Sequence, residues 1–268
     1  MIITLLSDLG SHDAEVTIVK AILSDTLPQV QIVDISHSVP QFNLQQAAYL
    51  LLSAYKHFPD ETIHIILVDV FAGVAPSMLL FKYQNQYFIA PDNGILPLIF
   101  GEEISDARLC YEFKKPYSFN EWPQNAAKIA RAIASGESEI LYQPCELKTE
   151  LRFMQPKLLH DGVECNILYI DQFENVVLDI TKAQFEEIIG SNPFRIRVTR
   201  SHELTVISNN YNDVGENEAL CRFNDTGYLE IAINQGKAAS ILGLGAFNSG
   251  KLLYQTIKIS ILPPGSVS

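Results

Sequence analysis

The stretch IHIILVD, residues 63–69, decides the fold of the first half of the chain. Apart from His64 it is apolar up to its closing aspartate, and a mainly apolar run of this length is typical of a strand that is covered on both faces. Ile2–Leu6 is a second run of this kind, and Val30–Ile35 is predicted as a further strand. The first half is therefore expected to be built around buried strands.

Segments with helical spacing of apolar residues lie between these strands. The first follows Ser11 or Asp13, either of which suits the N-cap of a helix. A second is predicted after Asn43 and a third from Pro123, a residue that is favoured in the first turn of a helix. Strands that alternate with helices predict an α/β domain with a mostly parallel sheet flanked by helices.

The hydrophobic period changes to two in the second half. Apolar and polar residues alternate in 194–199, 229–234 and 257–261, which is the pattern of strands with one solvated face. This pattern predicts a small antiparallel barrel or sandwich.

The two patterns predict two domains. The first, an α/β domain expected to bind a nucleoside, covers 1–145, and the second covers 163–268. The segment 146–162 is polar and irregular and contains Pro156, so it is predicted as a linker.

Composition and charge exclude several classes of function. The chain has 268 residues, of which 47% are hydrophobic, enough for a sizeable core. Its 19 basic and 31 acidic side chains give a net charge of −12, which argues against nucleic acid or an anionic membrane surface as a partner. No apolar stretch has the length of a membrane span, and the first residues do not resemble a signal peptide. The four cysteines form no CxxC pair, so free thiols and a cytoplasmic location are expected.

Three acidic residues stand at the predicted carboxyl ends of strands: Asp8, Asp34 and Asp69. Each alone is readily explained as a helix cap or a turn residue. Together they favour a ligand site, because open α/β sheets bind ligands at this edge. A carboxylate there can accept both hydroxyl groups of a ribose. No glycine-rich phosphate motif follows the first strand, so phosphate binding is not predicted.

Histidine and serine patterns give no independent catalytic site. His37 is interpreted either as a base or ligand or as a strand-end histidine that is bonded to the backbone. The six histidines lack metal-binding spacing, and no Gly-x-Ser-x-Gly motif is present, so we predict no metal site and no serine nucleophile.

Several short motifs resemble those of a known family. In the first half they are Ser7–Gly10, Lys20, Val33–His37, Ala47–Leu50, Phe58–Pro59 before Ile63–Asp69, and Ala90–Gly94. In the second half they are Ile170–Asn175, Gly227–Ala232 and Gly236–Ala239. In this order they are similar to the motifs of the S-adenosylmethionine hydroxide adenosyltransferases, a family that also contains the S-adenosylmethionine-dependent fluorinase and chlorinase. The resemblance runs from the first strand to about residue 244.

The resemblance implies an α/β domain followed by a small β-barrel. It also implies homotrimers that hold the ligand between the first domain of one subunit and the second domain of its neighbour. In the implied reaction, water or halide attacks the 5′ carbon of S-adenosylmethionine and methionine leaves as a neutral thioether. A sulfonium is already a good leaving group, so the site mainly has to desolvate and orient the nucleophile. S-adenosylmethionine is then substrate or ligand, and no separate cofactor is expected.

The resemblance assigns five binding residues. Asp8 matches the aspartate that holds the ribose hydroxyls, and Phe42 falls where halogenating members have an aromatic residue near the ribose or adenine. Phe173 and Asn175 match the adenine-contacting pair of the second domain. Asp171 matches an acid that contacts the methionine end.

The match to the hydrolytic residues is incomplete. Asp69 matches the aspartate of the Asp-Arg-His set with which hydrolytic members activate water. The segment that follows has no arginine before Arg108, and Asn120 stands where the histidine is expected. Asn120, Glu121 or Ser77 are possible substitutes, and Asp69 and Asn120 are the predicted catalytic residues.

Two functions compete on this basis. The first is hydrolysis of S-adenosylmethionine to adenosine and methionine. The second is that of a catalytically degenerate protein, which binds S-adenosylmethionine or adenosine without turnover. If Glu174, which replaces a glycine of the family, fills the adenine loop, the protein would bind neither ligand. Halogenation is disfavoured because an ionised Asp69 would repel a desolvated halide and because Asn224–Gly227 lacks the arginine of halogenating members.

Overall fold

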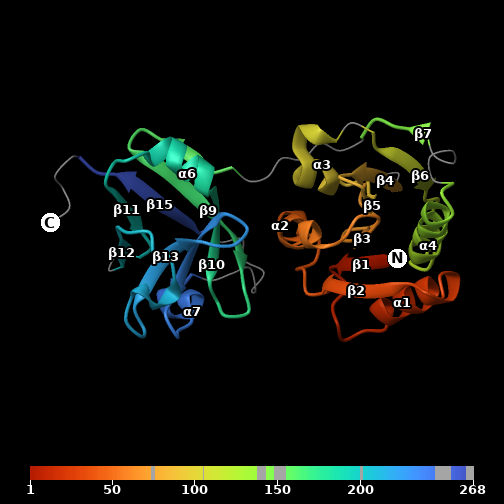
Figure 1. Cartoon of the computed structure of the whole chain (residues 1–268), viewed down its shortest axis with the longest axis horizontal. Coiled ribbons are helices and arrows are strands. Elements are labelled where there is room, and N and C mark those ends of the chain that lie inside the picture. The colour runs from red at the N-terminus through yellow and green to blue at the C-terminus, as the bar shows by residue number, and fades with distance from the viewer. Residues whose placement is uncertain are drawn as a thin grey trace. The chain divides into compact units, whose positions relative to one another are not determined.

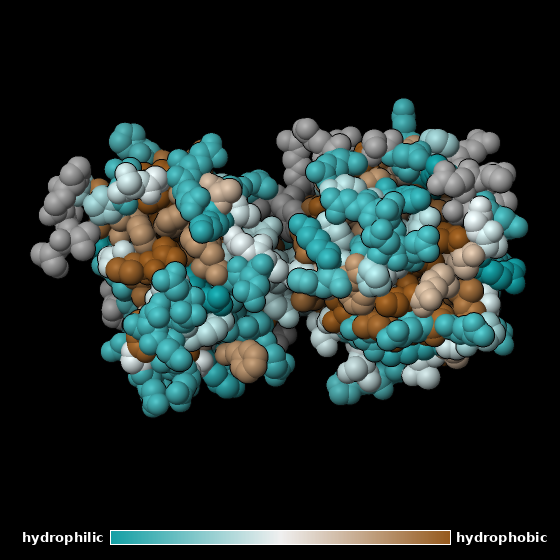
Figure 2. Space-filling model, in the orientation of Figure 1, coloured by the Kyte–Doolittle hydropathy of each residue, from teal (hydrophilic) through white to brown (hydrophobic). Residues whose placement is uncertain are grey.

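The chain divides into two compact units, Met1–Phe153 and Met154–Ser268 (Figure 1). The structure, a computed structural model, describes residues 1–73, 76–104, 106–137, 143–147, 155–199, 202–244 and 255–263. Hydrophilic side chains cover much of the visible surface of both units (Figure 2). Within the described ranges, no helix has the length and hydrophobicity needed to cross a membrane.

The first unit is built on a mixed sheet, which in the described residues has seven strands in the order β2-β1-β3-β5-β4-β6-β7. The strands are β1 (Ile2–Ser7), β2 (Gln31–Ser36), β3 (Ile63–Leu67), β4 (Ser77–Tyr83), β5 (Gln86–Pro91), β6 (Arg108–Glu112) and β7 (Gln143–Pro144). Neighbouring strands from β2 to β5 are parallel, whereas β4, β6 and β7 pair in antiparallel fashion. The antiparallel part begins with a hairpin, because Gln84 and Asn85 adopt positive φ and join β4 directly to β5.

Helices cover both faces of this sheet, as the α/β prediction required. They are α1 (Glu15–Thr26), α2 (Leu44–Ala54), α3 (Ile95–Phe100) and α4 (Glu121–Ala134), with short 3-10 turns η1 (Tyr55–His57) and η2 (Gly101–Glu103). Successive side chains of β1 point to opposite faces, so Leu5 packs with α1 and α4 while Leu6 packs with α2 and α3.

The helix starts were predicted with mixed success. Asn43 caps α2 as expected, since its side chain accepts from the backbone N–H of Gln46 at 3.1 Å. The predicted caps Ser11 and Asp13 are wrong, because α1 begins after Ala14.

His64 is the polar residue of the stretch that decides the fold, and it is fully buried. Its Nδ1 lies 2.7 Å from Thr4 Oγ1, its Nε2 lies 3.2 Å from Gln86 Oε1, and its ring stacks on Phe88. The Gln86 amide in turn donates to the Phe58 carbonyl at 2.7 Å. Burial lowers the pKa of His64 to about 4, so this histidine is a neutral part of the core.

The second unit is a nearly closed antiparallel barrel. Its strands are β8 (Lys157–Leu159), β9 (Gly162–Ile170), β10 (Val176–Thr181), β11 (Phe194–Arg197), β12 (Glu203–Leu204), β13 (Ala219–Phe223), β14 (Tyr228–Ile233) and β15 (Thr256–Ile261). The order is β12-β11-β15-β9-β10-β14-β13, with β8 beside β9. A bridge between Ile207 and Cys221 joins the segment after β12 to β13 and so draws the two ends of the sheet together.

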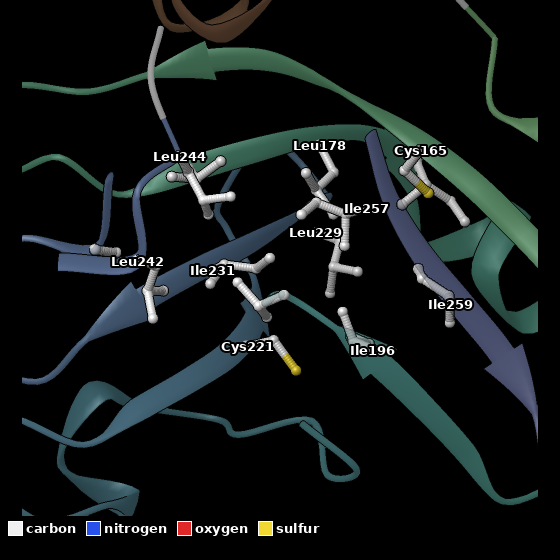
Figure 3. Packing of buried hydrophobic residues seen from close by; sticks show 14 of the residues in the cluster. Cys165, Leu178, Ile196, Cys221, Leu229, Ile231, Leu242, Leu244, Ile257 and Ile259 are labelled. Carbon is white, nitrogen blue, oxygen red and sulfur yellow. The ribbon is translucent and has the colours of Figure 1, made fainter. Parts of the chain in front are cut away.

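Side chains from around the barrel fill its interior, among them Cys165, Leu229 and Ile257 (Figure 3). The barrel also carries α6 (Lys182–Ile189), α7 (Ala238–Leu242) and the 3-10 turn η3 (Tyr211–Asp213). Among the described residues of this unit the carboxylates of Asp179 and Glu230 are buried. Asp179 accepts from Asn166 N at 2.8 Å and from Asn166 Nδ2 at 2.6 Å. Burial raises the pKa of Asp179 to about 6.

The segment expected as a linker is partly structured. Residues 157–159 form β8 and Gly162 begins β9, both inside the second unit. Part of the remainder, 148–154, lies outside the described residues.

Candidate functional site

Three polar residues follow adjacent parallel strands of the first unit. Asp8 comes after β1, Asp69 after β3 and Asn93 after β5, and these strands are neighbours in the sheet. The carboxyl ends of parallel strands meet at one edge, where open α/β sheets bind ligands. The structure therefore brings together two of the three predicted acids and adds an asparagine.

The carboxylate of Asp8 is fixed by backbone donors from two other segments. Its Oδ2 accepts from the N–H of Phe42 at 3.0 Å and from the N–H of Asp69 at 3.2 Å. Among the described residues no hydrogen bond reaches its Oδ1. One oxygen of Asp8 is thus held in place while the other is available to a ligand.

Asp69 adopts the left-handed backbone conformation, with φ of 48°. Within the described part of the chain its carboxylate makes no hydrogen bond. Burial, together with the negative charge of Asp8, raises the pKa of Asp69 above its ordinary value. The result is a carboxylate that is more basic than an ordinary aspartate and unpaired within the described residues.

Asp34, the third predicted acid, is engaged elsewhere. It lies within β2, and its Oδ2 is 2.6 Å from Lys20 Nζ while its Oδ1 is 3.1 Å from His37 Nε2. Burial raises its pKa, but the hydrogen bonds from Lys20 and His37 outweigh burial and leave the pKa below its ordinary value. The carboxylate of Asp34 is therefore occupied by Lys20 and His37 and is not free for a ligand.

His37 connects Asp34 to the buried residue before Asp8. Its Nδ1 lies 2.7 Å from Ser7 Oγ, and its carbonyl accepts from Gly10 N at 2.9 Å. Ser7 is fully buried, so its hydroxyl is inaccessible to a substrate. The imidazole thus contacts the side chains of Ser7 and Asp34, and the expected bond from the histidine ring to the backbone is not found among the described residues. Through Ser7 and Gly10, His37 contacts the chain on both sides of Asp8.

Phe42 is displayed beside Asp8. Its φ of 62° and its N–H bond to Asp8 fix the backbone, while 66% of the residue is exposed. Large apolar side chains are usually buried, so an exposed aromatic residue at a fixed position suits contact with a ligand.

An aromatic stack joins the Asp69 segment to the Asn120 segment. The rings of Phe71 and Tyr117 are parallel, with centroids 5.1 Å apart, and Phe113 meets Phe71 edge-on. Phe71 follows Asp69 by two residues and Tyr117 precedes Asn120 by three. The two predicted catalytic residues thus belong to segments that pack against each other.

The three possible substitutes for the missing groups differ in accessibility. Asn120 is exposed, stands at the N-cap of α4 and makes no side-chain cap bond. Glu121 begins α4 and is half-buried, whereas Ser77 is buried within β4. Accessibility favours Asn120 and Glu121 over Ser77.

In the second unit, Asp171 organises the loop between β9 and β10. Its Oδ1 accepts from Phe173 N at 2.9 Å and from Asn175 N at 2.8 Å, and its Oδ2 accepts from Asn175 Nδ2 at 3.0 Å. Phe173, at the tip, is 75% exposed, while Asn175 is buried. Asp171 therefore holds Phe173 outward, in the same way that Asp8 holds Phe42.

Glu174 is tied to the start of α7. Its carboxylate accepts from Lys237 Nζ at 2.9 Å, from Ser240 N at 3.0 Å and from the Ser240 hydroxyl. The bonds from Ser240 and Lys237 lower the pKa of Glu174. The side chain that replaces the family's glycine is thus occupied with α7.

No metal centre accompanies these residues in the described part of the chain, where no three His, Cys, Asp or Glu side chains are grouped suitably for a metal ion.

Sequence reasoning missed Asn93 and Ser7. Both stand at a strand end inside a quoted motif, Ala90–Gly94 or Ser7–Gly10, and that position was the available signal.

Known proteins resemble the chain over nearly its whole length. A family model for the SAM hydroxide adenosyltransferase N-terminal domain matches residues 3–135, and one for the C-terminal domain matches residues 165–249. The (R)-S-adenosyl-L-methionine hydrolase of Thermus thermophilus is 27% identical over 251 residues, covering 89% of this chain and 94% of that protein. A fluorinase of an Actinoplanes species is 22% identical over 278 residues, covering 89% and 92%.

A solved structure agrees with the fold. The crystal structure of an uncharacterized conserved protein from Thermotoga maritima matches with a TM-score of 0.80 and 27% identity, covering 97% of this chain and all of that one. Both domain models match in order, and the first includes Asp8 and Asp69. The chain therefore belongs to the SAM hydroxide adenosyltransferase family.

Proposed function

We propose that the protein hydrolyses S-adenosylmethionine to adenosine and methionine. The observation that carries this proposal is the Asp8–Asp69 pair, in which one aspartate is fixed with a free oxygen and the other is basic and unpaired within the described residues. Its wider support is membership of the family and similarity to proteins named as hydrolases of this substrate.

The proposed reaction is a displacement at the 5′ carbon. A water oxygen forms a bond to that carbon, the carbon–sulfur bond breaks, and its electron pair stays on the sulfur of methionine. Asp69 accepts the proton that the water loses, and its raised pKa suits this role. We assign Asn120 to orient the water, because its segment packs on that of Asp69 and its side chain is exposed.

Following the family resemblance, substrate binding is assigned to the first unit of one subunit and the second unit of its neighbour in the expected trimer. Asp8 Oδ1 would accept the ribose hydroxyls, with Phe42 as an apolar neighbour of the sugar or base. The Phe173 ring and Asn175 are assigned to adenine and Asp171 to the methionine end. Because Asp171 already accepts three bonds in its own loop, its main contribution is to hold Phe173 in position.

Product identification tests the proposal. S-adenosylmethionine is incubated with the wild type, with Asp8→Ala and with the exposed control Asp13→Ala, and products are separated by liquid chromatography with mass detection. Adenosine and methionine in equal amounts from the wild type and the control, and a large loss in Asp8→Ala, are expected. Breakdown no faster than in buffer at high enzyme concentration contradicts the proposal.

Binding without turnover is the second candidate, and the departures from the hydrolytic set favour it. Asn120 replaces the histidine, and Arg108 is paired with Asp106 at 2.9 Å. Titration calorimetry with S-adenosylmethionine and adenosine separates the candidates: binding without product formation supports the second, and no binding at millimolar ligand contradicts both.

Assembly and location complete the proposal. A homotrimer is expected from the family resemblance, and sedimentation velocity measures it; a monomer at micromolar concentration would contradict it. The four cysteines are free thiols, which supports a reducing, cytoplasmic compartment.

A further inference from the structure

Asn93 joins the end of β3 to the start of α3. Its side chain is buried, with 5% of the residue exposed. The amide Nδ2 donates to the Val68 carbonyl at 2.9 Å and to the Asp69 carbonyl at 3.2 Å, while Oδ1 accepts from Ile95 N at 3.2 Å. Both ends of the amide are therefore hydrogen-bonded. Two of its three partners are the carbonyls of Asp69, which has the left-handed conformation, and of Val68, the residue before it.

The backbone of Asp69 is held on both sides. Its N–H donates to Asp8 Oδ2, and its carbonyl accepts from Asn93 Nδ2 and from Ala72 N, the latter at 3.2 Å. A left-handed conformation is uncommon for a residue with a side chain and persists where surrounding contacts fix it. These three bonds hold the backbone of Asp69, and with it the position from which the carboxylate projects.

We propose that Asn93 is a positioning residue for the hydrolysis, holding Asp69 in the left-handed conformation that presents its carboxylate to the attacking water. This inference rests on the proposed function. The chemistry of the position requires an amide, because only a side chain with two N–H donors and one acceptor satisfies Val68, Asp69 and Ile95 together. An ionised aspartate would repel the two carbonyls, and a serine would supply one donor at most.

A double-mutant cycle separates positioning from stability. Asn93→Ser and Asp69→Asn are made singly and together, and kcat and KM are measured with Asn234→Ser as the matched control. Asn234 is also a buried asparagine, and its Nδ2 donates to the Val214 carbonyl at 2.9 Å, so its loss reports the general effect of removing such an amide.

Asn93→Ser is expected to lower kcat about 10- to 100-fold, as for a small misplacement of a catalytic group, with KM nearly unchanged. In the Asp69→Asn background it is expected to have no further effect, since the group that it positions is gone. The same loss in both backgrounds, or an equal loss in Asn234→Ser, would overturn the proposal.

A second readout does not depend on activity. The carboxyl carbon of Asp69 is followed by NMR through a pH titration in the wild type and in Asn93→Ser. The raised pKa of Asp69 is expected to move toward its ordinary value in the variant, because the carboxylate is released from its position. An unchanged titration in a folded variant overturns the positioning role even if the wild type proves inactive, and inactivity alone counts against the proposed function.

Asn93→Asp is the second variant, since it preserves the shape of the side chain and the bond from Ile95. It is expected to lower kcat like Asn93→Ser. If neither variant folds, the amide serves stability alone and the proposal is overturned.

Discussion

The backbone N–H of Asp69 donates to the carboxylate of Asp8, so the aspartate at the end of β3 is held by the aspartate at the end of β1. This bond connects the residue to which we assign ribose binding, Asp8, with the residue to which we assign water activation, Asp69. It also brings a negative charge close enough to Asp69 to raise its pKa. The behaviour of each aspartate is therefore expected to depend on the other.

Asp69→Asn removes the proton acceptor and retains the size of the side chain. We expect kcat to fall by about 10²–10⁴-fold, the usual range for a general base, with KM little changed. Steady-state kinetics measure the effect, and the same samples are examined for a chlorinated nucleoside in chloride buffer. A variant that hydrolyses at the wild-type rate would remove Asp69 from the mechanism.

The pH profile of kcat/KM reports the ionisation of Asp69. Because its pKa lies above the ordinary value near 3.8, activity is expected to decline at a higher pH than an ordinary aspartate would require. Burial is the larger cause of the raised pKa and the charge of Asp8 the second, so Asp8→Asn should shift the acid limb part of the way to lower pH. The exposed Asp13→Asn controls for net charge, and a limb that stays in place or moves upward in Asp8→Asn would contradict the coupling.

The exposed aromatic residues Phe42 and Phe173 are predicted to contribute to ligand binding and not to the stability of the fold. Phe42→Ala and Phe173→Ala should each weaken nucleoside binding by about 1–3 kcal/mol, the range for stacking of a base on an aromatic ring. The unfolding temperature should stay nearly constant, since both residues are mostly exposed. Calorimetry compares them with Val206→Ala, an equally exposed apolar control at 70%; equal affinity in all three variants would argue against these contacts.

His37→Ala tests the support of the Asp8 loop. The substitution removes the bonds to Ser7 and Asp34 and leaves the Asp8 carboxylate intact. We expect KM for S-adenosylmethionine to rise several-fold while the pH profile of the remaining activity is unchanged. His202→Ala, at an exposed position of the second unit, is the control. A shifted acid limb in His37→Ala would instead assign the histidine a proton-transfer role.

The two units are predicted to respond oppositely to acid. His64 has a pKa of about 4 when folded and 6.5 ordinarily, so the unfolded chain binds the proton first and the first unit loses stability as the pH falls from 6.5 to 4. Asp179 has a pKa of about 6 when folded and 3.8 ordinarily, so the folded barrel keeps a proton that the unfolded chain releases, and the second unit gains stability over pH 6 to 4. Each effect is on the order of 3 kcal/mol.

Hydrogen exchange resolved by peptide measures the two units separately. Protection of β3 should decrease and protection of β10 should increase on acidification. His64→Gln and Asp179→Asn should each flatten the response of their own unit only. If both units respond in the same direction in the wild type and neither variant changes its slope, the assignment to these two residues is wrong.

The apolar runs were sufficient to predict the α/β unit and the positions of Asp8 and Asp69 at strand ends, because a buried strand has a strong local pattern. The sheet is mixed because β4 pairs in antiparallel fashion with both β5 and β6. The apolar pattern alone does not specify this pairing. Asn93 escaped prediction because its role consists of bonds to Val68 and Asp69, more than twenty residues away. The placing of Asn120 depends likewise on the Phe71–Tyr117 stack, a tertiary contact.

Isotope incorporation tests the central claim most directly. The wild type is given S-adenosylmethionine in ¹⁸O-labelled water, and the adenosine formed is analysed by mass spectrometry. We predict one ¹⁸O atom on the 5′ carbon of every adenosine molecule, with loss of this product in Asp69→Asn. Adenosine without the label, or no adenosine above the buffer control, would contradict attack by water at the site of the paired aspartates.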